Sequence, residues 1–472
     1  MAGVELASRT GRGIVAAAVL GSGMAFLDGT VVNVALVRIG TDLDASLADL
    51  QWVSNGYLLS LASLILLGGS LGDRFGRRRI FVLGVIGFAV ASALCGAAPT
   101  PGLLIAARVL QGVAGAMLTP GSLSMIEATI RREDRAKAIG SWSGLGGVAG
   151  AIGPFVGGWL VQYASWRWAF FLNIPLAVVT VLLARRYVPE TRDEQAERGR
   201  FDVLGAVLAT ATLALTTYAL IQHAALGPAL TTTLAVAGVL VGVGFVVVER
   251  RTHTPMVQPS LFRERQFTGA NVMTLVVYGA LGAVMFFLTL QLQTVLGYGP
   301  LLAGLATLPM TVLMLFLAAR GGELGARIGP RLPMTIGPLV CAGGVALLAP
   351  LRADSSYVTG VLPGVVVFGL GLCLLVAPLT ATVLAAAPDR YAGAASGVNN
   401  AVARAGTLLA VAALPALVGL GGEAYRDPAV FSGAFRTAMW LSAALLVAGG
   451  AVSWLLIRNT PRNAPLASTS PD

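Results

Sequence analysis

Charge is scarce in this sequence. Only 11% of its 472 residues are charged, whereas 56% are hydrophobic and the mean hydropathy is +0.80. Because soluble domains carry about 25% charged residues, this composition excludes a water-soluble globular protein. The net charge of +10 does not indicate a nucleic-acid partner, because the arginines punctuate apolar runs instead of gathering on one soluble domain. The expected partner of most of this surface is therefore a lipid bilayer.

Cysteine, histidine and lysine are also scarce. Lys137 is the only lysine and Ala138 follows it, which excludes a P-loop ending in Gly-Lys-Ser/Thr. His223 and His253 are the only histidines, and both lie in connections, so no nucleophile–base pair is expected inside the apolar runs. The three cysteines stand singly in separate runs, which argues against metal and disulfide frameworks: Cys95, Cys341 and Cys373. We expect no enzyme activity, no metal or other cofactor, and no ATPase subunit.

Long apolar runs dominate the chain. A helix that crosses a bilayer core needs about 20 apolar residues, and the runs predict fourteen such helices in an all-α polytopic membrane protein. They lie near 13–36, 51–71, 79–98, 102–125, 138–161, 168–186, 203–222, 229–249, 268–291, 301–319, 333–351, 356–379, 394–420 and 436–457. The predicted organisation is a six-helix half (13–186), a linker with two extra helices (187–267), a second six-helix half (268–457) and a cytoplasmic tail (458–472).

The placement of basic residues predicts the orientation. Two of the 32 basic residues lie within the expected spans and five on odd-numbered connections, so the other 25 lie on the termini and even-numbered connections. Short loops rich in Lys and Arg stay in the cytoplasm. Both termini are therefore expected to be cytoplasmic, and the chain to be a multi-pass protein of the cytoplasmic membrane.

A basic motif occurs twice. Residues 69–79 read Gly-Ser-Leu-Gly-Asp-Arg-Phe-Gly-Arg-Arg-Arg, and residues 322–331 read Gly-Glu-Leu-Gly-Ala-Arg-Ile-Gly-Pro-Arg. Each copy follows the second apolar run of its half, which indicates that one unit was used twice. The motif resembles the signature of the major facilitator superfamily of transporters. That resemblance implies two six-helix halves around a central cavity, and a gating loop made by Gly69, Asp73, Arg74, Gly76, Arg77 and Arg78. It also implies that Asp73 stabilises the outward-facing state, by pairing with its own loop or capping a helix of the other half.

The fifth run carries a glycine stripe. Gly146, Gly150, Gly153 and Gly157 recur at helical spacing beside Pro154, followed by Gly158. Such a stripe lets a neighbouring helix approach closely, which ordinary small-residue packing would also explain. The run resembles the motif that marks antiporters within the superfamily. It implies that Gly150 and Pro154 help to close the periplasmic side, and that a side chain at Gly150 would overpack.

Three further segments are similar to the fourteen-helix drug:proton antiporters of the EmrB/QacA type. They are residues 27–36, residues 108–112 and residues 166–175. One departure from that family lies in the thirteenth run, where some relatives carry a second acid. This chain has Asn399, Asn400 and Arg404 there, so selectivity for organic cations is not implied.

Asp28 is the one acid placed deep within a predicted helix. An ionised carboxylate there is costly, and its pKa responds to burial and to nearby cations, so we expect it to couple proton movement. A static charge neutralised by an arginine is the alternative. Arg108 shares a helical face with Gln111 and is expected either to tune a carboxylate or only to hold helices together. Arg404 is the corresponding candidate in the second half, unless it reaches toward the membrane interface.

A polar wall is expected to line the substrate cavity, although ordinary packing would explain the same pattern. Its members are Asn33, Gln111, Asn271, Thr274, Tyr278, Asn400 and Arg404. The function predicted from these features is proton-coupled efflux of small hydrophobic drugs, antibiotics or metabolites. A proton-coupled symporter for a nutrient is the alternative within transport, and a membrane-embedded enzyme or a passive channel is the alternative outside it.

The charge distribution generates a topology test. Asp42→Cys and Gln195→Cys, placed separately in a cysteine-free variant, should react oppositely with an impermeant thiol reagent in intact cells. Position 42 should react from outside, and position 195 should be protected, because the basic loops are expected to be cytoplasmic. Equal labelling of the two positions would contradict the predicted orientation.

Overall fold

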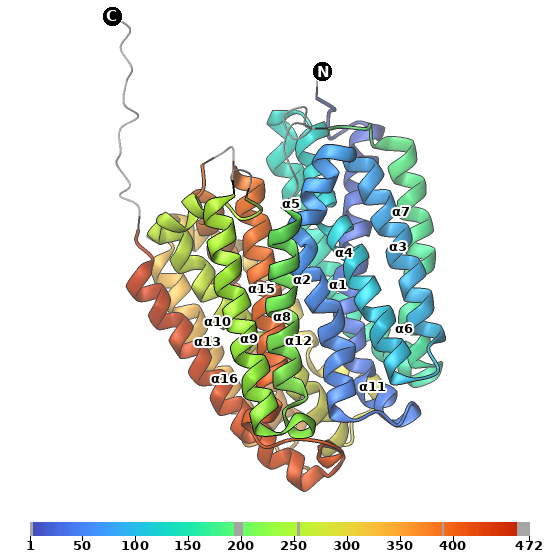
Figure 1. The fold of residues 1–472 in the computed structure, drawn as a ribbon, viewed down its shortest axis with the longest axis vertical. Helices are drawn as coiled ribbons and strands as arrows, with labels where there is room; N and C mark the ends of the chain where they lie inside the picture. Colours follow the sequence, from blue (N-terminus) through green and yellow to red (C-terminus); the bar gives the residue numbers. More distant parts are fainter. Residues whose placement is uncertain (1–2, 193–201, 253–254, 389–390, 460–472) are drawn as a thin grey trace, which may run out of the picture.

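The computed structural model describes residues 3–192, 202–252, 255–388 and 391–459, and it is a bundle of long helices (Figure 1). Position 195 and most of the expected tail lie outside these residues. Fourteen helical segments of the described chain are long and apolar enough to cross a membrane, which confirms the predicted number. No strand occurs in the described part of the chain.

The helices follow the predicted order. The first group comprises α1 (Arg9–Asp42), α2 (Leu47–Phe75), α3 (Arg77–Ala97), α4 (Pro101–Thr129), α5 (Arg132–Tyr163), α6 (Trp166–Phe171) and α7 (Asn173–Tyr187). The inserted pair is α8 (Val203–Ile221) and α9 (His223–Arg251). The second group comprises α10 (Arg265–Leu290), α11 (Pro300–Ala306), α12 (Leu308–Ile328), α13 (Arg331–Leu348), α14 (Leu362–Ala385), α15 (Ala392–Leu417) and α16 (Pro428–Leu456). We call α1–α7 the N-terminal group and α10–α16 the C-terminal group.

Two predicted spans are each divided into two helices. α6 gives way to α7 at Leu172, and α11 gives way to α12 at Thr307. Prolines at positions 175 and 309 explain both breaks, because a proline lacks the backbone N–H and its ring crowds the carbonyl four residues earlier. These breaks were not part of the sequence-based prediction.

The two groups meet along two seams. α2 packs against α15 on one side, and α5 packs against α11 on the other. The inserted α8 lies against both α2 and α15, so it covers the first seam, while α9 packs on α8 (Figure 1). Only 6% of the residues in the most apolar stretch of α9 are buried, so this helix faces lipid.

The repeated motif forms two equivalent joints. Gly76 ends α2 with a φ of +110°, and Gly329 ends α12 with a φ of +89°, a conformation that favours glycine. The joints are closed by equivalent partners from after α7 and after α16. The amide of Arg78 donates to Glu190 Oε1 at 3.1 Å, and the amide of Arg331 donates to Asn459 Oδ1 at 3.1 Å. The duplication inferred from the sequence is therefore also a duplication of backbone geometry.

The ends of the bundle are distinguished by the chain termini. α1 begins and α16 ends on one side, which we call the terminal end (Figure 1). The α1–α2 connection, residues 43–46, marks the opposite end, which we call the hairpin end. There α2 begins with a capping box, in which Ser46 and Asp49 each bond the other's backbone amide.

Candidate functional site

An ion pair lies buried inside the N-terminal group. Asp28 on α1 and Arg108 on α4 are 0% and 1% exposed. Arg108 Nη1 donates to Asp28 Oδ2 at 2.5 Å and to Gln111 Oε1 at 2.7 Å. Breaking such a buried pair on one side costs about 3–5 kcal/mol, because the remaining charge has no counter-ion. This pairing fits both roles considered from the sequence, a carboxylate that couples proton movement and a static charge neutralised by an arginine.

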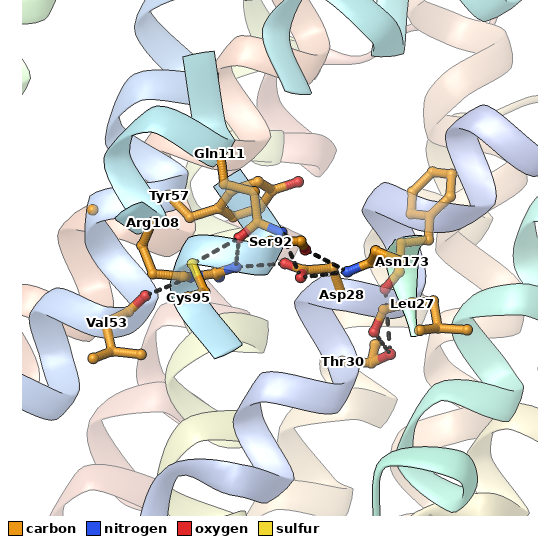
Figure 2. A network of polar contacts seen from close by, with 12 residues as sticks. Leu27, Asp28, Thr30, Val53, Tyr57, Ser92, Cys95, Arg108, Gln111 and Asn173 are labelled. Atoms are coloured by element: carbon orange, nitrogen blue, oxygen red, sulfur yellow. Dashed lines mark hydrogen bonds and ion pairs between the residues drawn. The ribbon is translucent and has the colours of Figure 1, made fainter. Parts of the chain in front are cut away.

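The second oxygen of the carboxylate is held by two amides. Asp28 Oδ1 accepts hydrogen bonds from Gln111 Nε2 at 2.8 Å and from Asn173 Nδ2 at 3.2 Å. Both amides also donate to the Ser92 hydroxyl, at 2.8 and 2.9 Å. Figure 2 shows Ser92, Gln111 and Asn173 converging on the carboxylate. Asp28 thus connects α1 with α3, α4 and α7 through one small polar network.

Arg108 is also held on its far side. Its Nε donates to the Val53 carbonyl of α2 at 2.9 Å, and its guanidinium carbon lies 4.5 Å from the centre of the Tyr57 ring. The Tyr57 hydroxyl is buried and has no hydrogen-bond partner in the described residues. A proton on Asp28 would neutralise the carboxylate that pairs with Arg108. It would also occupy one of the oxygens that accept hydrogen bonds from Arg108, Gln111 and Asn173. The charge state of one carboxyl is therefore connected to the packing of five helices.

Three members of this environment were not predicted. Ser92, Asn173 and Tyr57 are each at most 1% exposed. The available signal was polarity in an apolar context: Ser92 lies in the third apolar run, and Asn173 precedes the proline that divides the sixth span. Periodicity alone does not show that residues 64 positions apart, such as Asp28 and Ser92, share hydrogen-bond partners.

The expected polar wall forms a second cluster. On α10, Asn271 and Thr274 are buried, and the Asn399 side chain of α15 donates to Asn271 Oδ1 at 3.2 Å and to Thr274 Oγ1 at 2.8 Å. The backbone carbonyl of Tyr278 accepts from Thr407, at 3.1 Å. Gln111 belongs instead to the Asp28 network, so the predicted cavity residues do not form one contiguous cluster.

Three other predicted residues are placed individually. Asn33 is half-buried on α1 and forms no side-chain hydrogen bond within the described chain. Asn400 is exposed, and its side chain donates only to the Ser396 carbonyl of its own helix at 3.4 Å. Arg404 is half-buried, and no described carboxylate lies within ion-pair distance of it. The structure therefore gives Arg404 no carboxylate to tune.

Two ion pairs lie at the loop between α2 and α3. Asp73 Oδ1 accepts from Arg77 Nε at 2.8 Å, one turn away, and Arg78 pairs with Glu190 at 3.6 Å. Of the two predicted roles of Asp73, the structure contains pairing within its own loop. Glu190 was not predicted as a partner, although it is the acid that follows the sixth span.

The glycine stripe of α5 packs against α1. Gly146 and Gly150 face Phe26, Gly153 faces Thr30 and Gly157 faces Val31, so the stripe does mediate close helix packing. Gly150 is not its tightest point: a Cβ atom there would lie 3.9 Å from Phe26 Cβ, an ordinary van der Waals distance. A single added carbon at Gly150 therefore meets no clash, and the overpacking expected of a larger side chain there stays a prediction. At Gly157 a Cβ atom would lie 2.7 Å from Val31 Cγ1.

Pro154 and Gly158 belong to the seam between the two groups. A Cβ atom on Gly158 would lie 2.6 Å from the Pro300 carbonyl oxygen, and a Cβ atom on Gly304 of α11 would lie still closer to the Pro154 carbonyl oxygen. Nearby, the Leu301 amide donates to Gln162 Oε1 at 3.2 Å. This part of the motif contacts the C-terminal group at the hairpin end.

Polar contacts also tie the two groups together at the hairpin end. Arg426 Nη2 donates to Asp44 Oδ1 at 3.0 Å and to the Gly40 carbonyl at 3.2 Å, and the Tyr425 hydroxyl donates to the Ala45 carbonyl at 2.9 Å. The hydrogen bond to Tyr425 and the pairing with Asp44 raise the pKa of Arg426, which keeps this guanidinium charged.

A second pair of contacts lies beside that cluster. Gln51 donates to the Val411 carbonyl at 2.8 Å, and Gln293 donates to the Val34 carbonyl at 3.0 Å. The contacts around Arg426, Gln51 and Gln293 all lie toward the hairpin end. They hold this end closed together with the Pro154–Gly158 part of the glycine motif, and these polar contacts were not expected from the sequence.

Comparison with known proteins agrees with this architecture. The family model described as Major Facilitator Superfamily matches residues 18–411. The chain is 38% identical to the puromycin resistance protein pur8 of Streptomyces alboniger, covering 82% of this chain and 78% of that protein. It is 36% identical to the tetracenomycin C resistance and export protein of Streptomyces glaucescens, with coverages of 85% and 75%. It is 34% identical to the methylenomycin A resistance protein of Bacillus subtilis, with coverages of 94% and 95%.

Solved structures share the fold at low sequence identity. An inward-facing bacterial homologue of the human lysosomal transporter Spinster matches with a TM-score of 0.67 and 18% identity, covering 95% of this chain and 97% of that chain. A D-xylose–proton symporter matches with a TM-score of 0.67 and 15% identity, covering 95% and 98%. These similarities support the arrangement of helices and carry no information about the substrate.

The packing of α5 on α1 generates a stability test. Gly157→Leu should lower the free energy of unfolding by about 1–3 kcal/mol, because the new side chain overlaps Val31. Gly147→Leu is the matched control, since nothing lies within 4 Å of a Cβ atom at Gly147. Thermal unfolding of the two purified variants makes the comparison. Equal stability would show that the close approach at Gly157 is not required.

Proposed function

The chain belongs to the major facilitator superfamily of membrane transporters, and from that premise we propose that it exports small hydrophobic drugs, antibiotics or metabolites in exchange for protons. It is a transporter and not an enzyme, with fourteen apolar helices. Export is supported by relatives at 34–38% identity that are named as resistance and export proteins. Proton exchange is supported by one observation above all, the buried Asp28–Arg108 pair.

In this proposal Asp28 takes up and releases the proton. The carboxylate form is stabilised by Arg108 and by the amides of Gln111 and Asn173. A proton arriving from outside neutralises Asp28 and weakens its attraction for Arg108. Release on the cytoplasmic side restores the ion pair. Arg108 itself stays charged, because a guanidinium does not lose its proton in this pH range.

The proton site and the glycine stripe share one turn of α1. Asp28 faces α4 and α7, while Phe26, Thr30 and Val31 contact α5. α5 in turn forms the seam with α11 at the hairpin end. A change in the contacts of Asp28 is thus transmitted through α1 to the helix that closes this end, which gives a physical route from protonation to the opening of the transporter.

Transport then follows from rocking of the N-terminal group against the C-terminal group. With both termini in the cytoplasm, the hairpin end is the periplasmic end, and the structure corresponds to the inward-facing state. The α2–α3 loop, with Asp73 and Glu190, would act as the cytoplasmic gate. The energy source is the proton gradient across the cytoplasmic membrane, whose electrical part is worth about 2.3 kcal/mol per charge per 100 mV.

The direction of exchange is tested with purified protein in liposomes under an imposed pH gradient, using a panel of dyes, antibiotics and metabolites. An antiporter moves substrate and protons in opposite directions, so substrate should accumulate against its gradient on the side with more protons. Movement of substrate together with protons would instead indicate a symporter. Flux down the substrate's own gradient, at rates far beyond a carrier's turnover, would indicate a channel.

Asp28→Asn should abolish the proton flux that substrate drives, because the amide cannot release a proton. It should still bind substrate and allow substrate exchange. The variant should also lose about 3–5 kcal/mol of stability, because Arg108 would be left buried without a counter-ion. Proton flux and thermal unfolding are measured at matched protein amounts.

The double variant Asp28→Asn/Arg108→Gln separates coupling from structure. Removing both charges should recover part of the lost stability, since no unpaired ion remains. Coupling should stay absent. If the double variant regains substrate-driven proton flux, Asp28 serves only to neutralise Arg108 and is not the proton site.

A further inference from the structure

α15 carries a single charged residue, and that residue has no partner in the described chain. The helix runs over Ala392–Leu417, and Arg404 is its only charge. Arg404 is half-buried, and it makes no hydrogen bond or ion pair with the described residues. Unlike Arg108, it has no carboxylate beside it. Charged residues inside a membrane otherwise pair with one another or face a water-filled pathway.

The contacts between α2 and α15 give the height of Arg404. These helices run antiparallel: Gln51 bonds the carbonyls of Val411 and Ala412, and Leu66 lies against Gly397. Counting residues along both helices from these two contacts shows that Arg404 lies at the same depth as Leu58, near the middle of α2. Arg404 is therefore deep within the membrane, too far from either end for its side chain to reach the interface with ease.

The direction of Arg404 follows from the faces of α15. Asn399, Gly406 and Thr407 contact α10, whereas Gly397 contacts α2. An α-helix has 3.6 residues per turn, so Asn400 lies between the α10 face and the α2 face. Arg404 follows one turn later, and it lies next to Asn400 at the edge of the α2 face. The opposite side of α15 contacts α8, which packs on the outside of the α2–α15 seam. Asn400 is exposed although it lies on this inner side, so the space between the two groups is open there.

Tyr57 of α2 extends the environment of Arg108. Its ring lies over the guanidinium, with 4.5 Å between the guanidinium carbon and the ring centre. Its hydroxyl is buried and without a hydrogen-bond partner in the described residues. The inner faces of the two groups thus contain one neutralised charge pair and one uncompensated cation.

We propose that Arg404 binds the acidic group of the substrate, so that this transporter exports small organic anions with an apolar body. The inference rests on the proposed function and names the substrate class of the same pathway. A planar guanidinium binds a carboxylate with two parallel hydrogen bonds, and it also pairs with a phenolate or enolate. An organic cation would instead meet an unneutralised positive charge. A membrane potential that is negative inside also favours expulsion of an anion.

The first test measures whether Arg404 makes the electrostatic potential near Asn400 positive, and it does not require a known substrate. Asn400→Cys is introduced after Cys95, Cys341 and Cys373 are replaced by alanine, and its reaction rates with anionic sulfonatoethyl and cationic trimethylammonioethyl methanethiosulfonate are measured. Each rate is divided by the rate of the same reagent with free mercaptoethanol. The normalised anion-to-cation ratio should exceed one and should fall about tenfold with Arg404→Gln, since the charge acts oppositely on the two reagents.

Two controls make this result specific. Arg404→Lys keeps the charge and should retain most of the ratio. Arg436→Gln removes an exposed arginine of α16 and should leave the ratio unchanged. A ratio near one, or a ratio that Arg404→Gln does not alter, would overturn the proposal. Absence of reaction with both reagents would overturn it as well, because Asn400 would then not face an open pathway.

Transport supplies the second measurement. The liposome panel includes rhodamine 110, which has a free carboxylate, and rhodamine 123, its methyl ester, together with matched acid and ester pairs of other scaffolds. Arg404→Gln should reduce export of the acids at least tenfold, Arg404→Lys should reduce it less, and esters should be poor substrates of every variant. Preferential export of esters or cations by the unmodified protein would overturn the proposal. If nothing is exported, the proposed function fails, and the labelling ratio still decides whether Arg404 creates an anion-selective field.

Discussion

A carboxylate in the middle of a bilayer has to be neutralised, and the N-terminal group is built around that requirement. Asp28 reaches no solvent, and each of its oxygens is held by donors from other helices. Three helices meet at this carboxylate, and two more are joined to it indirectly, α3 through Ser92 and α2 through the Val53 carbonyl. The low dielectric that makes the lone charge expensive also makes its pairing strong. Changing its protonation state is therefore a change in helix packing as well as in charge.

The two helix groups share a backbone plan and differ in their charges. Both use a glycine with positive φ to turn from the second helix of the repeat to the third, and both close that turn with a side chain from just beyond the last helix. The N-terminal copy uses the acid Glu190 where the C-terminal copy uses Asn459. The same asymmetry occurs within the membrane, where Arg108 pairs with an acid and Arg404 pairs with no acid of the described residues. Duplication accounts for the shared backbone plan, and single charged residues have diverged between the two copies.

The seams between the groups combine two kinds of contact. Close approach of small residues, as at Gly158 and Gly304, brings backbones together with few side chains to rearrange. Exposed and polar contacts around Arg426 then hold the hairpin end closed. A buried apolar cluster also spans both groups at this end, with Ile39 and Leu50 of the N-terminal group and Leu414 and Leu420 of the C-terminal group among its members. Separation of the groups at this end therefore has to expose apolar surface as well as break the polar contacts.

The sequence by itself determined the membrane character, the number of helices, the duplicated joint and the position of an acid, Asp28, deep within a helix. Each of these depends on local composition or on spacing along one helix, because a bilayer requires apolar runs of defined length and penalises an isolated charge. Only the tertiary structure decided which residues meet across helices. It brought Asn173 to Asp28 and Ser92 to the amides that hold this carboxylate, and it placed polar contacts between the groups around Arg426. It showed that Gly153 and Gly157 approach α1 more closely than Gly150 does, and that Arg404 has no ion-pair partner among the described residues. Helices pack through side chains distant in sequence, and no period within one helix encodes the rotation and depth at which its neighbour docks.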